Sequence, residues 1–446
     1  MKRSVSTWLV SCVLLTLPVF AEDPVAPEPD AGPDLQFGVE AKAHFRSSDD
    51  NRFPVAFFPA AAGVFQETVS PGEHFEVSTL TLFADLTWGE TVTGLAKVDI
   101  VDLYDRNPTS EDRQVDIDEV WLRFGRETQP AMLPERPGVY LKLGKMSKFE
   151  RQDDRHLESY GLVSTAFNRF EDAGVELGVD LGRYVYLKAT ATQGNPVFLR
   201  DPNALAGDNG TPRRVSLPVG PDLGSGFPIF YDAEIEGLDV DGELETGAGL
   251  GFRLADPTGD RGIDVLVWGY QRTLAETVKL EGTIYGGDLD LLDGPTGNEG
   301  SPSLRGDDKE EFGANLWLYL RGLTVFLQYA DQELAGLPRT GLEGEVAWSF
   351  ELPLRWAVGG SQLFPFIQPA VRYSKLDNDF VNRGGGVDKS FPAPSVQWDW
   401  EKLDVGVRLG ILDGIDLTLE YAANRMSTAR GEIDNDEVLT TLRWSM

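Results

Sequence analysis

Hydrophobic and polar residues alternate with a period of two along much of this chain of 446 residues. The clearest case is residues 35–46, where apolar side chains hold the odd positions and polar or small residues hold the even ones. This alternation predicts a β-strand with one face in water. The polar face includes Glu40, Lys42 and Arg46. It therefore carries charge of both signs, which suits a water-filled interior.

The same pattern recurs along the chain and predicts sixteen strands. Residues 115–125 change phase, which indicates a bulge, and residues 263–272 do not show which face is outward. A further hairpin arm at 278–286 would raise the count to eighteen. The predicted strands are 35–46, 75–88, 91–101, 115–125, 138–145, 172–181, 184–192, 244–254, 263–272, 312–321, 323–331, 340–350, 366–375, 402–411, 415–424 and 437–446.

The last predicted strand keeps its alternation to the end of the sequence. Val438, Leu442, Trp444 and Met446 fall on one face, and Leu439 is the one apolar residue on the other. A membrane strand needs this pattern when lipid lies on one side and water on the other. We therefore expect the chain to end inside a sheet rather than in a frayed, polar tail.

The N-terminal segment has the pattern of an export signal. A basic start is followed by the mostly apolar run Trp8–Phe20 and by a small residue, Ala21. The run is too short for a membrane-spanning helix, which takes roughly 20 apolar residues. A lipoprotein signal ending at Cys12 is the weaker alternative, because the apolar run continues past that cysteine. The expected parts are a cleaved signal peptide at 1–21, a disordered Pro/Asp-rich lead-in at 22–34 and a barrel at 35–446.

Charge and size narrow the class of protein further. The net charge of −32 becomes −34 when Lys2 and Arg3 leave with the signal peptide (−32 − 2). This acidity excludes nucleic acid as a partner, because no basic field attracts it. Cleavage also removes the only cysteine, so neither disulfides nor cysteine metal sites are expected. The remaining 425 residues (446 − 21) exceed an ordinary single core, which is more easily explained if lipid covers the outside.

The connections between the predicted strands differ in length according to their position. Two-residue turns follow even-numbered strands at Gly89-Glu90, Gly182-Arg183, Arg321-Gly322 and Asp413-Gly414. Long connections follow odd-numbered strands at 47–74, 146–171, 193–243, 273–311 and 376–401. Tight turns on one rim and long loops on the other are typical of bacterial outer-membrane barrels. We therefore expect an all-β, closed antiparallel transmembrane β-barrel with short periplasmic turns and long extracellular loops.

Aromatic residues lie at the short-turn ends of several predicted strands, where an interfacial girdle belongs. They are Trp88, Phe124, Trp348, Phe350 and Trp444. The alternative is a soluble propeller or sandwich, whose inward face would be packed with apolar side chains. The polar face here carries many charges, and burying them would cost several kcal/mol for each. The pattern favours the membrane barrel.

The segment Leu141-Lys-Leu-Gly-Lys-Met-Ser-Lys-Phe149 is similar to the start of the inward-folded third loop of Gram-negative outer-membrane porins. Within that group, the segment and the overall length most resemble the phosphate-selective O/P-type family. The resemblance implies a homotrimer in the cell outer membrane, in contact with lipid and lipopolysaccharide. It also implies passive diffusion of small polar or ionic solutes. One departure is Met446, which stands where such porins usually end in Phe.

The third long connection, 146–171, is the expected constriction of the pore. Its basic residues and those of its approach are unusually dense for an acidic chain, although the alternative is that they are solvated or paired locally. The candidate constriction residues are Lys145, Lys148, Arg151, Asp153, Asp154 and Arg155. Other basic residues lie at strand positions that the alternation predicts to face the pore. These candidate wall residues are Lys42, Lys97, Arg123, Lys142, Lys188, Arg372 and Arg408.

Enzymatic and metal-binding functions find little support, and no cofactor is expected. His156, near Asp153 and Asp154, is the only catalytic candidate, and a solvated loop histidine is the simpler interpretation. The segment 239–243 lacks the ligand spacing of a calcium loop. Loose calcium binding by acidic outer loops is a further hypothesis. The alternative function is a structural or adhesion barrel whose acidic loops bind a partner or cations.

Overall fold

The protein's computed structural model describes residues 32–49, 52–54, 65–67, 72–101, 115–152, 155–167, 171–194, 214–216, 223–224, 244–256, 260–273, 308–334, 336–354, 356–379, 399–428 and 431–446. The expected signal peptide, residues 22–31 of the lead-in and the hairpin arm at 278–286 lie outside these residues. Of the helices in the described ranges, none is long and apolar enough to cross a membrane.

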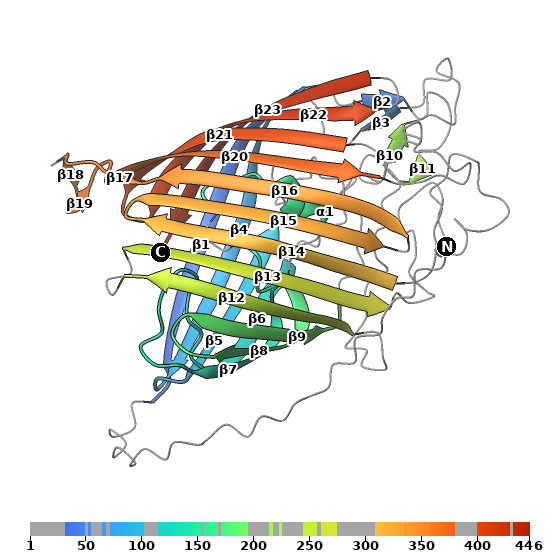
Figure 1. The fold of residues 1–446 in the computed structure, drawn as a ribbon. Coiled ribbons are helices and arrows are strands. Elements are labelled where there is room, and N and C mark those ends of the chain that lie inside the picture. Colours follow the sequence, from blue (N-terminus) through green and yellow to red (C-terminus); the bar gives the residue numbers. More distant parts are fainter. Residues whose placement is uncertain are drawn as a thin grey trace, which may run out of the picture.

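Sixteen antiparallel strands form a closed ring in chain order (Figure 1). Every predicted strand is confirmed, in the predicted order, with ends that differ by a few residues. The ring consists of β1 (Asp34–Ser48), β4 (Gly72–Trp88), β5 (Val92–Val101), β6 (Val115–Gly125), β7 (Val139–Ser147), β8 (Glu171–Asp180), β9 (Val185–Thr192), β12 (Glu245–Ala255), β13 (Arg261–Thr273), β14 (Asp308–Leu320), β15 (Leu323–Leu334), β16 (Leu337–Trp348), β20 (Phe366–Asn378), β21 (Asp399–Leu412), β22 (Ile415–Thr428) and β23 (Gly431–Ser445).

The last strand closes the ring against the first. β1 pairs with β4 on one side and with β23 on the other, so neither strand has a free edge. The backbones of Val39 and Met446 exchange hydrogen bonds of 2.9 and 3.0 Å, so the sheet extends to the last residue. Leu439, the misfit of the alternation, faces inward and packs on Ala422.

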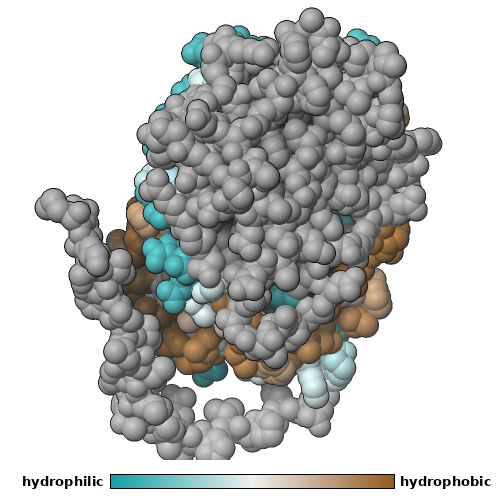
Figure 2. Space-filling model, turned by 90° about the vertical axis from the view of Figure 1, so that its right-hand side faces the viewer, coloured by the Kyte–Doolittle hydropathy of each residue, from teal (hydrophilic) through white to brown (hydrophobic). Residues whose placement is uncertain are grey.

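The outward face of the barrel is apolar and the inward face is polar. In β12, Leu250, Phe252 and Leu254 are exposed while Arg253 between them is buried. Figure 2 shows hydrophobic atoms gathered on the outer sides of the strands. The five predicted girdle aromatics are all exposed, and Trp348 stacks on Phe350 with ring centroids 5.1 Å apart. This is the arrangement that lipid outside and polar groups inside require.

Two uncertainties of the sequence are resolved by strand register. The register of β5 against β6 shifts between Lys97 and Val98, which leaves Asp118 as the extra residue of a bulge. The predicted phase change in this strand is therefore confirmed. In β13, Val265 and Val267 face outward, while Trp268 and Tyr270 face the interior.

The two rims of the barrel differ less sharply than expected. β15 ends at Leu334 and β16 begins at Leu337, and β22 ends at Thr428 and β23 begins at Gly431. Both tight connections lie on the long-loop rim, so the expectation that every tight turn lies on the other rim is wrong. The backbone pairing of these strands continues beyond the segments that alternate in the sequence. The two hairpins therefore end farther from the middle of the barrel than the predicted strands do. On the short-turn rim, the connections 126–138 and 349–365 are longer than two residues.

Short elements lie at the two rims (Figure 1). At the long-loop end, a small sheet contains β2 (Arg52–Pro54), β3 (Phe65–Glu67), β10 (Arg214–Ser216) and β11 (Leu223–Gly224). At the other end, β17 (Phe350–Glu351) extends the pairing with β20, and β18 (Ala357–Val358) pairs with β19 (Ser361–Gln362). The helix α1 (Leu162–Ala166) belongs to the connection between β7 and β8.

Candidate functional site: the inward-folded loop and the wall facing it

The connection between β7 and β8 folds into the barrel, where it binds strands on the opposite side. Its described residues, 148–152 and 155–167, contact inward-facing side chains of β12 to β16 and β20 to β22. We call this part of the barrel the covered wall. The remaining inward surface, on β1 and β4 to β9 together with the short-turn ends of β21 to β23, is called the bare wall.

The first residues of the loop are held by a buried ion-pair cluster and by ring stacking. Lys148 pairs with Glu245 of β12, and Lys309 of β14 pairs with the other carboxylate oxygen of Glu245. All three side chains are at most 4% exposed. Phe149 stacks on Tyr270 with centroids 5.6 Å apart and an interplanar angle of 29°. Burial alone would lower the pKa of Lys148, but the facing Glu245 raises it above 10.5.

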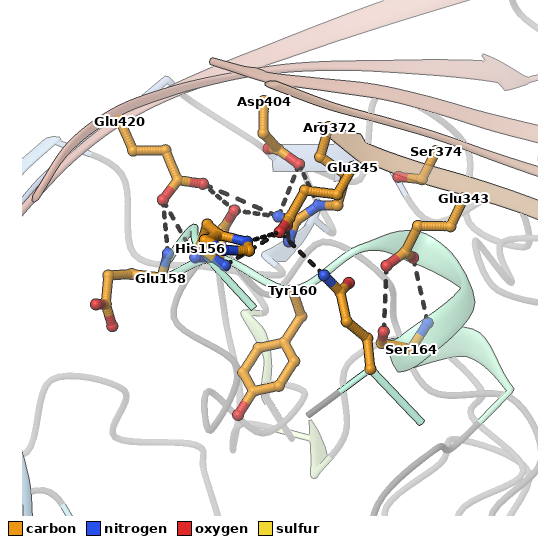
Figure 3. A network of polar contacts seen from close by, with 12 residues as sticks. His156, Glu158, Tyr160, Ser164, Glu343, Glu345, Arg372, Ser374, Asp404 and Glu420 are labelled. Carbon is orange, nitrogen blue, oxygen red and sulfur yellow. Dashed lines mark hydrogen bonds and ion pairs between the residues drawn. The ribbon is translucent and has the colours of Figure 1, made fainter. Parts of the chain in front are cut away.

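The middle of the loop is bound by buried carboxylates of the covered wall (Figure 3). Glu345 of β16 accepts hydrogen bonds from the backbone N–H of His156 at 3.1 Å and from its Nδ1 at 2.8 Å. Glu420 of β22 accepts a hydrogen bond from the backbone N–H of Glu158 at 3.0 Å and one from the hydroxyl of Ser159. His156 is buried. The expected solvated loop histidine is therefore wrong, because this imidazole helps to fix the loop to the wall.

A single arginine lies at the centre of this network. Arg372 of β20 donates to Asp404 of β21 at 2.8 Å and to Ser159 Oγ at 2.5 Å. Its guanidinium also lies 3.5 Å from Glu345 and 4.0 Å from Glu420. One buried cation thus joins three carboxylates of the wall to the loop.

The end of the loop packs as a small apolar core inside the barrel. The backbone N–H of Leu162 donates to Ser374 Oγ at 3.2 Å, and that of Val163 donates to Glu343 at 3.1 Å. Leu162, Val163 and Phe167 belong to a buried cluster with Trp400 and other inward apolar residues. Burying such side chains contributes about 1.5–3 kcal/mol each.

Glycines allow the loop to approach this closely. A Cβ at Gly161 would lie 1.9 Å from a carboxylate oxygen of Glu343. On the wall, a Cβ at Gly341 would lie 2.6 Å from the ring of Phe167 and 2.9 Å from Val163. A side chain at Gly161 would have to displace the carboxylate of Glu343, and one at Gly341 would have to displace Phe167 and Val163 of the loop.

The bare wall carries the same residue types in more open surroundings. Lys97 is 34% exposed and pairs with Asp118, and Arg123 is 16% exposed and lies 2.8 Å from Glu127. Arg408, near the short-turn end of β21, is 24% exposed and lies 2.8 Å from Asp416. These cations are paired, but water reaches them.

One face of the loop is turned toward the bare wall. The carboxylate of Glu158 and the ring of Tyr160 point away from the covered wall (Figure 3). Glu158 lies 3.1 Å from Lys42 of β1, and the guanidinium of Arg155 lies 3.7 Å from the ring centroid of Tyr160. Burial alone would raise the pKa of Glu158, but Lys42 and Arg155 lower it below 4.5. Acidic and basic groups therefore meet between the loop and β1.

The candidate constriction residues fall in different places. Lys145 shares the outward phase of Leu141 and Leu143, and its amine donates to the carbonyl of Ile117. Lys148 is a buried anchor, whereas Arg151 is partly exposed and pairs with Glu171 of β8. Asp153 and Asp154 lie outside the described residues.

The candidate wall residues divide between the two surfaces. Arg372 is buried beneath the loop, whereas Lys42, Lys97, Arg123 and Arg408 face the bare wall. Lys142 lies 4.4 Å from the ring centroid of Trp121, and Lys188 of β9 lies 2.7 Å from Glu127.

A second inward-folded segment, the connection 126–138 on the short-turn rim, was not anticipated from the sequence. The backbone N–H of Ala131 donates to Asp264 of β13 at 3.1 Å, and Gly138 and Asp180 exchange hydrogen bonds. A Cβ at Gly262 of β13 would lie 1.9 Å from the carbonyl oxygen of Ala131. The signal in the sequence was a connection of thirteen residues on the rim where the predicted two-residue turns lie.

Within the described ranges, one group of three carboxylates lies close enough to share a metal ion: Asp118, Glu119 and Glu171. Lys97 already pairs with Asp118, and Arg151 already pairs with Glu171. These two cations therefore already offset part of the negative charge of the group.

Comparisons with known proteins support the fold. No protein-family model matches the chain, and no curated protein matches it. The outer membrane channel DcaP of Acinetobacter baumannii is similar in structure over 93% of this chain and 98% of its own, at 12% identity and a TM-score of 0.50. The high-pH structure of OprB from Pseudomonas putida matches 92% of this chain and 94% of its own, at 8% identity and a TM-score of 0.52. At these identities the likeness shows the fold alone, and membership of the phosphate-selective O/P-type family stays a prediction.

Proposed function

We propose that the protein is a porin of the cell outer membrane through which small polar or ionic solutes diffuse passively. The closed ring, the apolar outside and the charged interior support this function. The solved barrels with the same architecture include a channel of the outer membrane. By resemblance, we also propose that the channel is a homotrimer.

The constriction is proposed to lie between the inward-folded loop and the bare wall. One observation carries this proposal: most contacts of the loop are with the covered wall, and Lys42, Lys97 and Arg123 stay 16–34% exposed on the other side, where Glu158 of the loop meets Lys42. Arg151, Arg155 and the carboxylate of Glu158 would form the loop side of the passage. Basic and acidic groups that face one another there would filter solutes by size and charge.

Conductance of the purified protein in a planar bilayer tests the function. We expect large, ion-selective current steps, and Lys42→Gln and Arg155→Gln should each move the reversal potential toward cation preference. Lys375→Gln is the matched control, because Lys375 has the same charge but shares the outward phase of Tyr373. A barrel that never conducts would refute the porin and would support a structural or adhesion function. Equal shifts in all three variants would refute the proposed constriction.

A further inference from the structure

A glutamate of the inward-folded turn 126–138 lies among three cationic side chains of the wall. Glu127 Oε2 is 2.8 Å from Arg123 of β6, and Glu127 Oε1 is 2.7 Å from Lys188 of β9. The hydroxyl of Tyr140 lies 3.2 Å from Oε1 and shares its one proton between this oxygen and Glu176. Arg123 and Lys188 therefore come from separate strands, and both contact a carboxylate that belongs to the turn.

The third cation is Lys142 of β7. Its amine lies over the Trp121 ring, and its charge acts on Glu127 together with those of Lys188 and Arg123. Burial alone would raise the pKa of Glu127, but these cations lower it to about 2. The surrounding cations therefore favour the ionised form of this carboxylate.

The wall keeps an excess of positive charge around this position. Besides Glu127, the neighbouring carboxylate is Glu176 of β8, which lies 3.7 Å from Lys188 and accepts a hydrogen bond from Tyr140. Three cations thus face two carboxylates. In addition, Arg123 Nε is buried and has no hydrogen-bond partner among the described residues.

Glu127 can leave this position without releasing the turn. The turn is fixed to the barrel by Ala131 at Asp264 and by Gly138 at Asp180, and neither contact involves Glu127. The carboxylate is 17% exposed, and it borders a small opening to solvent. Lys188 lines the same opening, so solvent reaches this cation from the side that the carboxylate occupies.

We propose that Arg123, Lys142 and Lys188 form a carboxylate-binding subsite on the pore wall, and that Glu127 is a tethered occupant which a permeating carboxylate displaces. The subsite deepens the proposed function and rests on it. When the carboxylate of a solute replaces that of Glu127, the same donors bind an anion before and after the exchange. No cation is therefore left unpaired.

Acetate is the simplest probe, because it carries the same group as the Glu127 side chain. In Glu127→Gln, we expect saturable inhibition of single-channel chloride current by acetate, with an affinity at least about tenfold higher than in the parent. Glu135→Gln is the matched control: Glu135 belongs to the same turn, is 88% exposed and pairs only with the exposed Arg126 in the described structure. The control should respond to acetate as the parent does.

The double variant Glu127→Gln/Lys188→Met should lose the high-affinity inhibition. The proposal is overturned if Glu127→Gln behaves as Glu135→Gln does, or if inhibition persists without Lys188. Line broadening of ¹³C-acetate with the detergent-solubilised proteins reports binding even where no current flows. Binding without current would refute the porin but support the subsite, and current without binding would refute the subsite alone.

Discussion

The covered wall and the bare wall are made of the same residue types in the same alternation, yet their charges meet different surroundings. Arg372 and Asp404 on the covered wall are 0% exposed, whereas Lys97 on the bare wall is 34% exposed. The difference comes from the loop, whose contacts are mostly with the covered wall and reach the bare wall at Lys42. Strand alternation thus determines which side chains face inward, and the loop buries those that lie beneath it.

The two walls should also differ in how much their ion pairs stabilise the protein. A buried charge costs several kcal/mol in lost hydration, which close partners must offset. Exposed pairs contribute about 0–1 kcal/mol, since water already solvates both groups. The covered wall therefore resembles the core of a soluble protein, and the bare wall resembles a surface.

The largest effect should follow from removing the central cation of the covered wall. Arg372→Met leaves Asp404, Glu345 and Glu420 without their shared partner. We expect the free energy of unfolding to fall by about 3–5 kcal/mol. Arg408→Met on the bare wall should cost less than about 1 kcal/mol. Urea unfolding in lipid vesicles measures both, and equal losses would contradict the distinction between the walls.

A side chain added beneath the loop should displace it. Gly341→Val would place methyl groups against Phe167 and Val163, so we expect a loss of about 1–3 kcal/mol in stability and a higher single-channel conductance. Gly344→Val is the control, because Gly344 lies on the outward phase of the same strand, where its Cβ would meet the flexible end of Leu327. An unchanged conductance in Gly341→Val, with the protein folded, would show that the loop does not narrow the passage.

Neutralising one lysine on each wall should change the ion selectivity of the channel by different amounts. Lys97→Gln should shift the reversal potential toward cation preference, because Lys97 is in contact with water. Lys402→Gln should shift it little, since Lys402 is 1% exposed and donates to the carbonyl of Tyr160. Reversal potentials under a salt gradient give both values. A larger shift for Lys402 than for Lys97 would place the ion path beneath the loop.

The smallest effect concerns pH. Glu158 has a lowered pKa, so its ionised form stabilises the folded protein above pH 4.5 and this contribution is lost as pH falls through the folded value. Below that point, Lys42 and Arg155 lose a counter-charge, and anion preference should rise. The change in reversal potential as pH falls from above 4.5 through the folded value should be smaller in Glu158→Gln than in the parent. Identical changes would show that Glu158 does not act on the passing ions.

The strands could be predicted from the sequence because a barrel wall depends on local alternation. Residues 35–46 and 437–446 show this most directly, and they pair with one another in the structure. The bulge in β6 was also visible as a change of phase. Lys145 was misplaced although its signal was present, since it has the same parity as Leu141 and Leu143.

The partners of the loop could not be predicted, because they are distant in sequence. His156 and Glu345 are separated by 189 positions, and no spacing rule joins them. The same holds for Ser159 and Arg372. The sequence argument that a packed interior could not bury many charges was incomplete, because loop groups and wall charges neutralise one another on the covered wall.

Cysteine accessibility in the conducting channel tests the central claim most directly, namely that the loop shields one wall and leaves the other open. Lys97→Cys places a thiol on the bare wall, and Ser374→Cys places one beneath the loop, where Ser374 binds the backbone of Leu162. With a charged methanethiosulfonate reagent, we predict rapid loss of current in Lys97→Cys and no reaction in Ser374→Cys. Equal reaction rates at the two positions would contradict the account.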